Sequence, residues 1–420
     1  MNWNWLKPSY WITTQHNQTV PENAIFYTSV DFEVSASHYR KPAIYAFGSY
    51  LFAFCEQRLD TIKDYGIMHI GMRRIKASKI KKGSPEGHKW DVYQQLPVLD
   101  GFRTMNPCPV GCSDTNNLYL LVSAISVHVL ESEILKGTSN EDFKIYVSCS
   151  SDFGDTWSDW KDITYNFSEN LPVGAKFVVT GPGHGFEMQS GCLVVPGFFY
   201  RNPDLFKLNK SVHLSSNHLK YPFRNVGCSF CLLSTDKGRS WFISSSTDNF
   251  AFCVSGGLFR NMGECSIVEC KRDCLLLNSG ECGNGQYRIL AKSLDGGLNW
   301  SRGSLCTELS ESSSRGCKGG LAKVVHENVT FVVAINCGHP SARKNLTLWL
   351  SSDCGKTWSK PWTVIDDQFC GYSDIDTVIC PGSKEQYVLL IFETGEKSEH
   401  ERIDFLCVDF AEILQMCQLE

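Results

Sequence analysis

The chain has 420 residues, of which 42% are hydrophobic and 20% are charged, close to the composition of an average globular protein. This length fits one large domain or two medium ones, and this composition argues against extensive disorder. A net charge of −5 argues against a nucleic-acid-binding surface. No apolar run reaches the roughly 18 residues of a membrane-spanning helix. The high counts of cysteine (20), glycine (34) and tryptophan (11) favour a β protein with glycine-containing turns.

Short β-like runs follow one another along the chain, each about five to ten residues long and bounded by Gly, Asp, Asn or Pro. In chain order, the clearest runs cover residues 49–56, 117–126, 144–150, 191–200, 230–235, 274–279, 286–293, 329–336, 346–352 and 386–393. Only residues 410–416 have a helical pattern, and the Ser-rich stretch 304–316 reads as a polar surface loop. No linker divides the chain, so one domain over residues 1–420 is expected, with residues 1–38 as a lead-in and first strand.

The N-terminal sequence lacks a basic start followed by an apolar core, so no signal peptide is expected. Six N-x-S/T sequons would matter only in a secreted protein, and they lie at Asn17, Asn166, Asn209, Asn299, Asn328 and Asn345.

The cysteines allow two interpretations. A cluster that would suit disulfides in a secreted chain is formed by Cys265, Cys270, Cys274 and Cys282. Cys55 and Cys407, however, lie inside apolar strand patterns, as buried free thiols do. Without a secretion signal, mostly reduced cysteines are expected. Cys228 and Cys231 form a CxxC pair with no second pair, so neither a metal nor another cofactor is expected.

One pattern, S-x-D-x-G-x-x-W, occurs four times, with its aspartates at Asp152, Asp236, Asp295 and Asp353. In each copy the aspartate can accept hydrogen bonds within a turn, the glycine supplies a positive φ, and the tryptophan can pack into the core. Such a unit cannot bury its own faces, so the repeats predict stacked sheets, as in a propeller. The aspartates are therefore interpreted as braces of turns.

The repeated pattern resembles the Asp box of the sialidase family. Further segments resemble the animal exo-α-sialidases of the cytosolic and plasma-membrane type, in family order: residues 39–58 (YRKPAIYAFGSYLFAFCEQR), 101–110 (GFRTMNPCPV), 180–196, 316–325 (GCKGGLAKVV) and 370–377 (CGYSDIDT). This resemblance implies a six-bladed β-propeller with its site at the central mouth. It also implies sialylated glycans, such as gangliosides, glycoproteins and oligosaccharides, as binding partners. The resemblance favours a cytoplasmic or peripheral membrane location.

Sialosides carry a carboxylate on the anomeric carbon, and guanidinium groups grip a carboxylate through paired hydrogen bonds. A carboxylate nucleophile would be repelled by that charge, whereas a tyrosine deprotonated by a glutamate would not; sialidases are the known tyrosine exception among glycosidases. The residue types needed are thus arginines, a Tyr–Glu pair and a separate acid.

The resemblance assigns catalytic roles to three residues. Tyr372 matches the nucleophile, Glu264 the glutamate that activates it, and Asp64 the general acid/base. Asp60 competes with Asp64, because both lie in one polar turn, and Glu269 competes with Glu264.

The resemblance also assigns binding roles. Arg40 and Arg343 match the first and third arginines that bind the substrate carboxylate, and Arg58 matches an arginine that supports the sugar's substituents. The glycerol and N-acetyl pockets are matched by Met105, Asn106, Glu131 and Tyr200.

The chain departs from the family pattern at three positions. Lys41 replaces an apolar residue beside Arg40; because neighbouring strand residues point to opposite faces, this lysine need not reach the site. Gly280 stands where the middle arginine of the triad is expected, and Arg288 could replace it only through a local insertion. Phe198 stands where relatives carry a tyrosine.

The leading hypothesis is therefore a retaining exo-α-sialidase, with transfer of sialic acid as a variant. The alternative is a sialic-acid-binding propeller with weak or no catalysis, which Gly280 supports. A third class, an unrelated Asp-box propeller that binds proteins, is disfavoured by Tyr372 and the two arginines.

Overall fold

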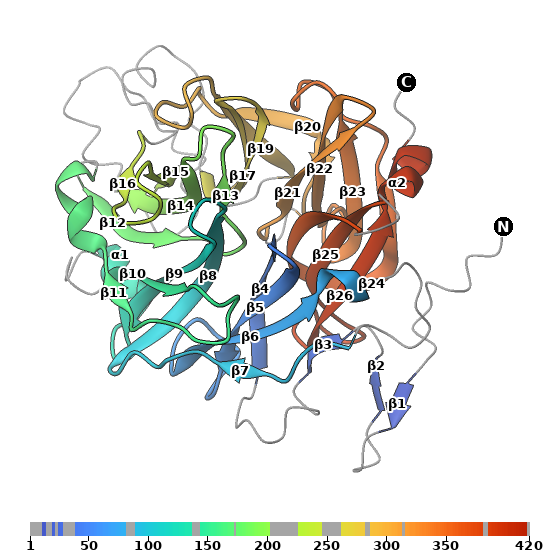
Figure 1. Ribbon diagram of the computed structural model, residues 1–420. Coiled ribbons are helices and arrows are strands. Elements are labelled where there is room, and N and C mark those ends of the chain that lie inside the picture. Colours follow the sequence, from blue (N-terminus) through green and yellow to red (C-terminus); the bar gives the residue numbers. More distant parts are fainter. Residues whose placement is uncertain are drawn as a thin grey trace.

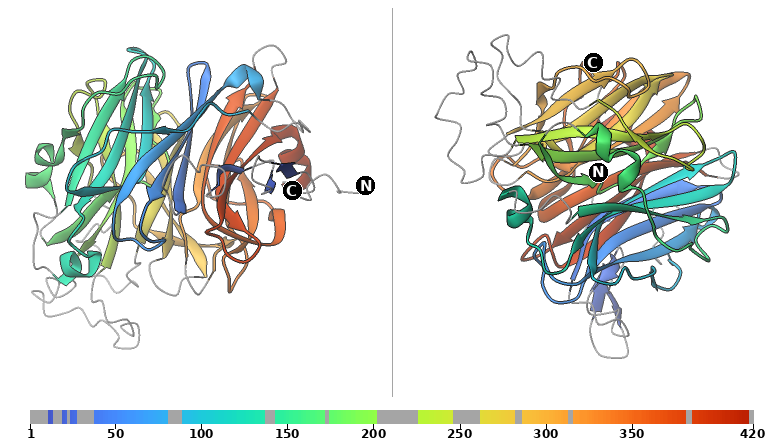
Figure 2. Two further views of the ribbon diagram at one scale, coloured as in Figure 1. Left: turned by 90° about the horizontal axis from the view of Figure 1, so that it is seen from below. Right: turned by 90° about the vertical axis from the view of Figure 1, so that its left-hand side faces the viewer.

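Antiparallel strands make up most of this computed structural model, which describes residues 11–13, 19–21, 24–27, 38–80, 89–136, 143–171, 174–201, 226–245, 262–281, 286–312, 316–380 and 385–417. Figure 1 shows the sheets arranged around a common centre, as in a β-propeller. Figure 2 shows that they follow one another around the molecule in chain order. Among the described residues, no helix has the length and apolar character needed to cross a bilayer.

The strands pair mostly with their neighbours in sequence. The first sheet contains β4 (His38–Phe47), β5 (Tyr50–Arg58), β6 (Met68–Lys76) and β7 (Gln94–Gln95). The second contains β8 (Phe102–Cys112), β9 (Asn117–Ser126), β10 (Phe143–Ser150) and β11 (Lys161–Asp162). The third contains β12 (Ala175–Thr180), β13 (Phe186–Glu187), β14 (Leu193–Arg201), β15 (Val226–Ser234) and β16 (Phe242–Ile243). The fourth contains β17 (Met262–Lys271), β18 (Cys274–Glu281), β19 (Tyr287–Ser293) and β20 (Ser304–Ser310).

The largest sheet brings the two ends of the chain together. It contains β21 (Gly320–His326), β22 (Val329–Cys337), β23 (Lys344–Ser351), β24 (Trp362–Ile379), β25 (Gln386–Gly395), β26 (Arg402–Asp409) and β3 (Ala24–Tyr27). The pairing of β3 with β26 joins residues from opposite ends of the sequence. A separate pair consists of β1 (Trp11–Thr13) and β2 (Thr19–Pro21). The helices are α1 (Glu131–Lys136), α2 (Phe410–Cys417) and 3₁₀ turns at Ala77–Lys79, Thr164–Asn166 and Ser168–Asn170.

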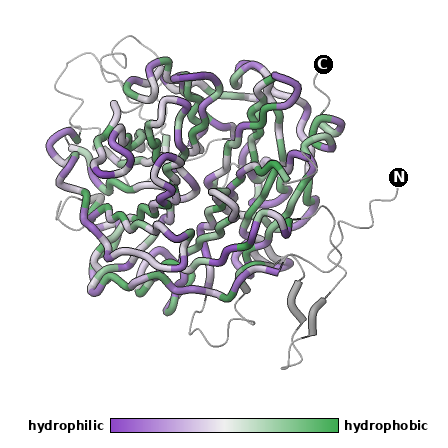
Figure 3. The backbone as a smooth tube through the Cα atoms, in the orientation of Figure 1, coloured by the Kyte–Doolittle hydropathy of each residue, from purple (hydrophilic) through white to green (hydrophobic). Residues whose placement is uncertain are grey.

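The predicted runs and the C-terminal helix are confirmed, because each expected run overlaps a strand and residues 410–416 lie in α2. Clusters of buried apolar side chains fill the spaces between successive sheets, and one of them joins the first sheet to β25, β26 and β3. Figure 3 shows hydrophobic residues concentrated in the strands. Burial between sheets holds the arrangement together, since each sheet alone would expose its apolar faces.

The interpretation of 304–316 as a surface loop is wrong for its first half. Residues 304–310 form β20, which pairs with β19. Cys306 and Leu309 are buried in the apolar cluster between the fourth sheet and its neighbour. The polar residues between them face outward on the edge strand, which hid the strand pattern.

The four Asp boxes brace turns as expected. In the last one, Asp353 Oδ1 accepts hydrogen bonds from the backbone N–H of Lys356 and Thr357, both at 3.0 Å. Gly355 has a φ of +70°, and Trp358 is buried. The boxes follow β10, β15, β19 and β23 and lead into the next strand in each case, so the aspartates serve the fold.

Among the described cysteines, 16 are free thiols and one pair, Cys270–Cys354, forms a disulfide. Cys270 therefore bonds outside the cluster noted in the sequence, to the Asp box of the following sheet. Cys282 lies outside the described residues.

Candidate functional site

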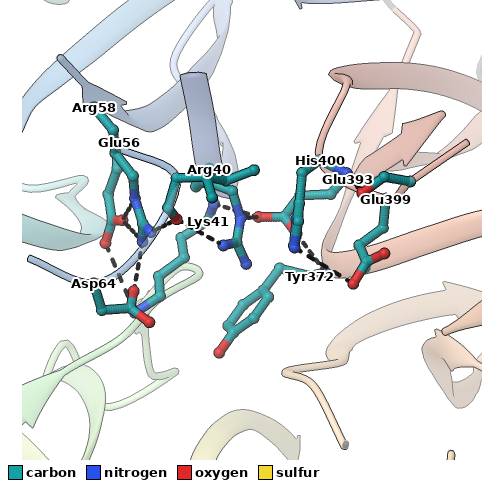
Figure 4. A network of polar contacts seen from close by, with 12 residues as sticks. Arg40, Lys41, Glu56, Arg58, Asp64, Tyr372, Glu393, Glu399 and His400 are labelled. Atoms are coloured by element: carbon teal, nitrogen blue, oxygen red, sulfur yellow. Dashed lines mark hydrogen bonds and ion pairs between the residues drawn. The ribbon is translucent and has the colours of Figure 1, made fainter. Parts of the chain in front are cut away.

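β-Bulges at the inner strands direct side chains into the centre of the molecule. The pairing of β4 with β5 shifts between Arg40 and Ala43, and β8, β17 and β24 carry comparable shifts at Met105/Cys108, Met262/Cys265 and Cys370/Ser373. A bulge adds a residue to one strand and redirects its side chain, and bulges occur often beside active sites. Of the expected site residues, Arg40, Met105, Asn106, Glu264 and Tyr372 lie at or next to these shifts. Figure 4 shows Arg40, Asp64 and Tyr372 gathered in one network of polar side chains.

Tyr372 on β24 and Glu264 on β17 are neighbours that interact electrostatically. Burial raises the pKa of the Tyr372 hydroxyl, and the Glu264 charge raises it further. Burial also raises the pKa of Glu264, although Lys41 and Arg343 oppose that shift. This glutamate can therefore accept a proton from a tyrosine that does not ionise on its own.

Two arginines flank the Tyr372 ring, with the Cζ atoms of Arg40 and Arg343 each 5.6 Å from its centroid. Arg40 Nε donates to Glu393 Oε1 at 2.7 Å, and Arg343 Nη1 lies 3.6 Å from Glu399 Oε1. These carboxylates hold the guanidinium groups over the tyrosine. The site can thus present two forked cations to an anion bound above the ring.

Asp64 lies beside Arg58, whose Nη2 donates to Asp64 Oδ1 at 2.7 Å. Arg58 also binds Glu56, which is fully buried. Burial favours the neutral acid, but Lys41, Arg58 and Arg40 outweigh it and hold the pKa of Asp64 below its usual range. The Asp64 side chain remains 47% exposed, so it is open to solvent and to a ligand.

The prediction that Lys41 need not reach the site is wrong. Lys41 has a φ of +51° and lies in the β4 bulge, so its side chain points to the same side as that of Arg40. Only 5% of the residue is exposed, and its Nζ donates to Asn106 Oδ1 at 3.0 Å. The alternation of side chains along a strand fails at a bulge, and the sequence did not reveal the bulge.

The residues expected to line the pockets lie in different surroundings. Asn106 (φ +55°) binds Lys41 and donates its backbone N–H to Glu56. Met105 is 2% exposed and belongs to the apolar core between the second and third sheets. Tyr200 packs edge-to-face against Phe198 at 5.7 Å.

Glu131 begins α1. Burial, together with the nearby Asp64 charge, raises its pKa to about 7. Glu131 therefore interacts electrostatically with the charged residues around Asp64 and Lys41.

The two competing carboxylates brace the backbone. Asp60 Oδ2 accepts the N–H of Ile67 at 3.1 Å, within the turn that carries Asp64. Glu269 accepts the N–H groups of Gln189 and Asp273. Within each competing pair, Asp64 and Glu264 are the members that lie near the charged Lys41 side chain.

Gly280 stands where an arginine was expected, and the side chains of Arg288 and Glu311 occupy the space next to its Cα atom. A Cβ at Gly280 would lie 3.2 Å from Arg288 Nη1 and 3.0 Å from Glu311 Oε1. Arg288 comes from the adjacent strand, is fully buried, and donates to Glu311, Asn278 and the Cys317 carbonyl. Its guanidinium therefore reaches the neighbourhood of Gly280 but is bound there by protein groups.

Three buried or part-buried carboxylates were missed in the sequence: Glu56, Glu393 and Glu399. Glu393 accepts hydrogen bonds from Arg40, the Lys41 N–H and the Tyr372 N–H, so it joins β4 to β24. Glu56 precedes Arg58 by two residues on the same strand, and that spacing was the one available signal. Among the described residues, no group of three or more His, Cys, Asp or Glu side chains could hold a metal ion.

Comparisons with known proteins give consistent results. Residues 75–383 match the family model described as a BNR repeat-like domain. The chain is 27% identical to Sialidase-3 of Bos taurus, covering 90% of this chain and 91% of that one. It is 28% identical to Sialidase-2 of Mus musculus, with 89% and 93% covered.

Solved structures share the fold. One is the Hadza microbial sialidase Hz136, with a TM-score of 0.69, 18% identity, and 90% of this chain and 67% of that chain covered. Another is the intramolecular trans-sialidase from Ruminococcus gnavus in complex with oseltamivir carboxylate, with a TM-score of 0.67, 14% identity, and 95% and 99% covered.

Proposed function

This chain belongs to the animal sialidase family and has its BNR repeat-like domain, and we propose that it is an exo-α-sialidase. It removes terminal sialic acid from glycolipids or glycoproteins with retention of configuration at the anomeric carbon. The observation that carries this proposal is the Tyr372–Glu264 pair, which lies under two arginines and near Asp64.

In the first step, Tyr372 Oη attacks the anomeric carbon while the bond to the leaving oxygen breaks. Glu264 takes the phenolic proton, and the acid form of Asp64 protonates the leaving oxygen. In the second step, Asp64 removes a proton from water, whose oxygen attacks the anomeric carbon. The bond to Tyr372 breaks, and the phenolate regains its proton from Glu264. Two displacements at one carbon retain its configuration.

Arg40 and Arg343 bind the substrate carboxylate, which lies on the anomeric carbon next to the nucleophile. Their positions 5.6 Å from the centroid of the tyrosine ring support this role, because they attract the anion and orient it over Oη. Arg58 supports the sugar's substituents and holds Asp64. Met105, Asn106, Glu131 and Tyr200 line the glycerol and N-acetyl pockets.

The fold that carries this site is a single six-bladed propeller over residues 1–420. The seven-stranded sheet corresponds to two blades that share the 18-residue β24, whose first part pairs with β23 and whose second part pairs with β25. In the last blade, β3 is the outer strand and comes from the N-terminal lead-in.

Gangliosides are among the substrates, and the protein acts in the cytoplasm or at a membrane surface as a peripheral protein. The similarity to Sialidase-3 supports a sialylated substrate. A propeller that only binds sialic acid is the alternative, and Gly280 is its support. The complete set of nucleophile, base and acid/base favours the enzyme.

A fluorogenic sialoside tests the proposal. The purified protein should release the fluorophore, and Tyr372→Phe should lose at least about 100-fold in kcat/KM, because the phenyl ring cannot attack. Proton NMR should detect the α anomer of free sialic acid first. A wild-type rate equal to that of Tyr372→Phe would reject the enzyme and leave the binding alternative.

A further inference from the structure

Lys41 places a buried positive charge among the acidic groups of the site. Its Nζ lies 3.6 Å from Asp64 Oδ1, 3.8 Å from Glu264 Oε1 and 3.9 Å from Glu56 Oε1. One hydrogen bond, to Asn106 Oδ1, anchors the ammonium. The amine therefore lies close to both the proposed acid/base and the proposed activator of the nucleophile, and Figure 4 shows the Lys41 side chain extending toward Asp64.

The backbone of Lys41 is held in place by the same group that holds Arg40. Glu393 Oε1 accepts the Lys41 N–H at 2.8 Å and Arg40 Nε at 2.7 Å. The bulge and the positive φ at Lys41 thus turn two consecutive cations toward the centre. A single buried carboxylate fixes both, so the arrangement is built into the fold.

Three cations surround the Tyr372 ring. Lys41 Nζ lies 5.7 Å from its centroid, compared with 5.6 Å for the Cζ atoms of Arg40 and Arg343. The Lys41 side chain is 7% exposed and that of Arg40 is 8% exposed, so both border the open centre to a similar extent. Arg288, near Gly280, is fully buried and bound to Glu311.

We propose that Lys41 is a positioning residue that supplies the third positive charge of the site. It takes the place of the arginine that was expected at position 280, where the chain has a glycine. It holds the carboxylates of Asp64 and Glu264 on either side of the bound sugar and favours binding of an anionic ligand. This inference rests on the proposed function for its kinetic consequences. The two departures from the family pattern then compensate each other.

The electrostatic consequence depends on all charges that face Lys41. These are Glu56 and Arg58 on β5, Asp64 in the following loop, Glu131 at the start of α1, and Glu264 on β17. Burial disfavours the ammonium, yet Glu56, Asp64 and Glu264 raise the pKa of Lys41, so it stays charged. In return, its charge stabilises the ionised forms of Asp64 and Glu264.

The test replaces Lys41 with methionine and with arginine. Lys41→Met should lower kcat/KM for a fluorogenic sialoside by at least about 10-fold, since a charged contact in a partly buried site is lost. It should also move both limbs of the pH profile to higher pH, by about one unit, because each carboxylate loses a stabilising cation. Lys41→Arg should restore most of the rate and the wild-type profile. A loss of activity without a shift of the profile would overturn the proposal.

Lys318→Met is a matched control, because Lys318 is also buried and paired with a carboxylate, Asp374, at 2.5 Å. This variant should leave the pH profile in place. Circular dichroism and thermal unfolding check that each variant is folded. If Lys41→Met does not fold, Lys41→Gln carries the test, since glutamine keeps a donor for Asn106. A wild-type rate and profile in a folded, uncharged variant would overturn the role of Lys41 while the sialidase stands.

Calorimetric titration with free sialic acid separates the two proposals. If the wild type hydrolyses no sialoside, the proposed function fails, and this binding experiment decides the role of Lys41. Weaker binding to Lys41→Met than to the wild type would support the third cation. Equal binding, or no binding by the wild type, would overturn it.

Discussion

The surroundings of Asp64 and Glu264 shift the pKa values of these two carboxyl groups in opposite directions. Burial would favour the neutral form of Asp64, but neighbouring cations hold its pKa below the usual range, whereas burial raises that of Glu264. The proposed first step needs Asp64 protonated and Glu264 ionised. Only a small fraction of molecules holds this combination, and the fraction is greatest at acidic pH.

An acidic optimum is therefore expected. Above the pKa of both carboxylates, each pH unit reduces the protonated fraction of Asp64 tenfold, so kcat/KM at about pH 8 should be at least about 10-fold lower than at about pH 5. Between the two pKa values the gain in protonated Asp64 offsets the loss of ionised Glu264, so the rate falls again only below the pKa of Asp64. Initial rates with a fluorogenic sialoside across this range check the expectation, and an alkaline optimum would contradict it.

Two glutamates on β17 allow a matched comparison. Glu264→Gln should lower kcat/KM by about 100- to 10,000-fold, because glutamine cannot accept the Tyr372 proton. Glu269→Gln should keep nearly the wild-type kcat/KM, since Glu269 bonds to the backbone of Gln189 and Asp273. Steady-state kinetics of both variants decide the assignment, and the opposite pattern of losses would make Glu269 the base.

At the scale of elements, bulges place several of the proposed site residues, and Asp boxes stabilise the turns. The bulged strands put Arg40, Lys41 and Asn106 at the centre, where regular strands would turn alternate residues away. The Asp boxes serve a different purpose, because their carboxylates bond within their own turns. In the first box, Asp152 accepts the N–H and hydroxyl of Thr156.

Asp353→Ala should therefore affect stability and not catalysis. It removes the acceptor for two backbone N–H groups and the Thr357 hydroxyl, which should lower the free energy of unfolding by about 1–3 kcal/mol. Denaturant unfolding measures this change, with the exposed Asp100→Ala as control. An unchanged midpoint, or a large loss of kcat/KM in the folded variant, would refute the bracing role.

At the scale of the whole molecule, the ends of the chain meet in one sheet. Phe26 on β3 is fully buried against residues of β5, β25 and β26. Since β3 is the edge strand of that sheet, this side chain holds the N-terminal segment to the C-terminal strands.

Phe26→Ala should lower the free energy of unfolding by about 3–5 kcal/mol, because it leaves a cavity in the cluster that joins the two ends. Tyr165→Ala removes an aromatic ring that is 65% exposed and should change little. Thermal and denaturant unfolding of both variants test whether the packing of β3 against the C-terminal strands stabilises the fold. Equal stability of Phe26→Ala and wild type would mean that β3 contributes little to the stability of the fold.

The amino-acid sequence by itself determined the strands, the C-terminal helix and the Asp-box turns, because these depend on local periodicity and turn chemistry. The motif resemblance also identified five candidate site residues, namely Arg40, Asp64, Glu264, Arg343 and Tyr372. Local pattern could not place Lys41, since a bulge reverses the direction of a side chain without a clear sequence signal. Nor could it reveal that Arg288 lies against Gly280, or that Glu393 and Glu399 hold the arginines. Those contacts join strands far apart in the chain, and only the tertiary structure brings them together.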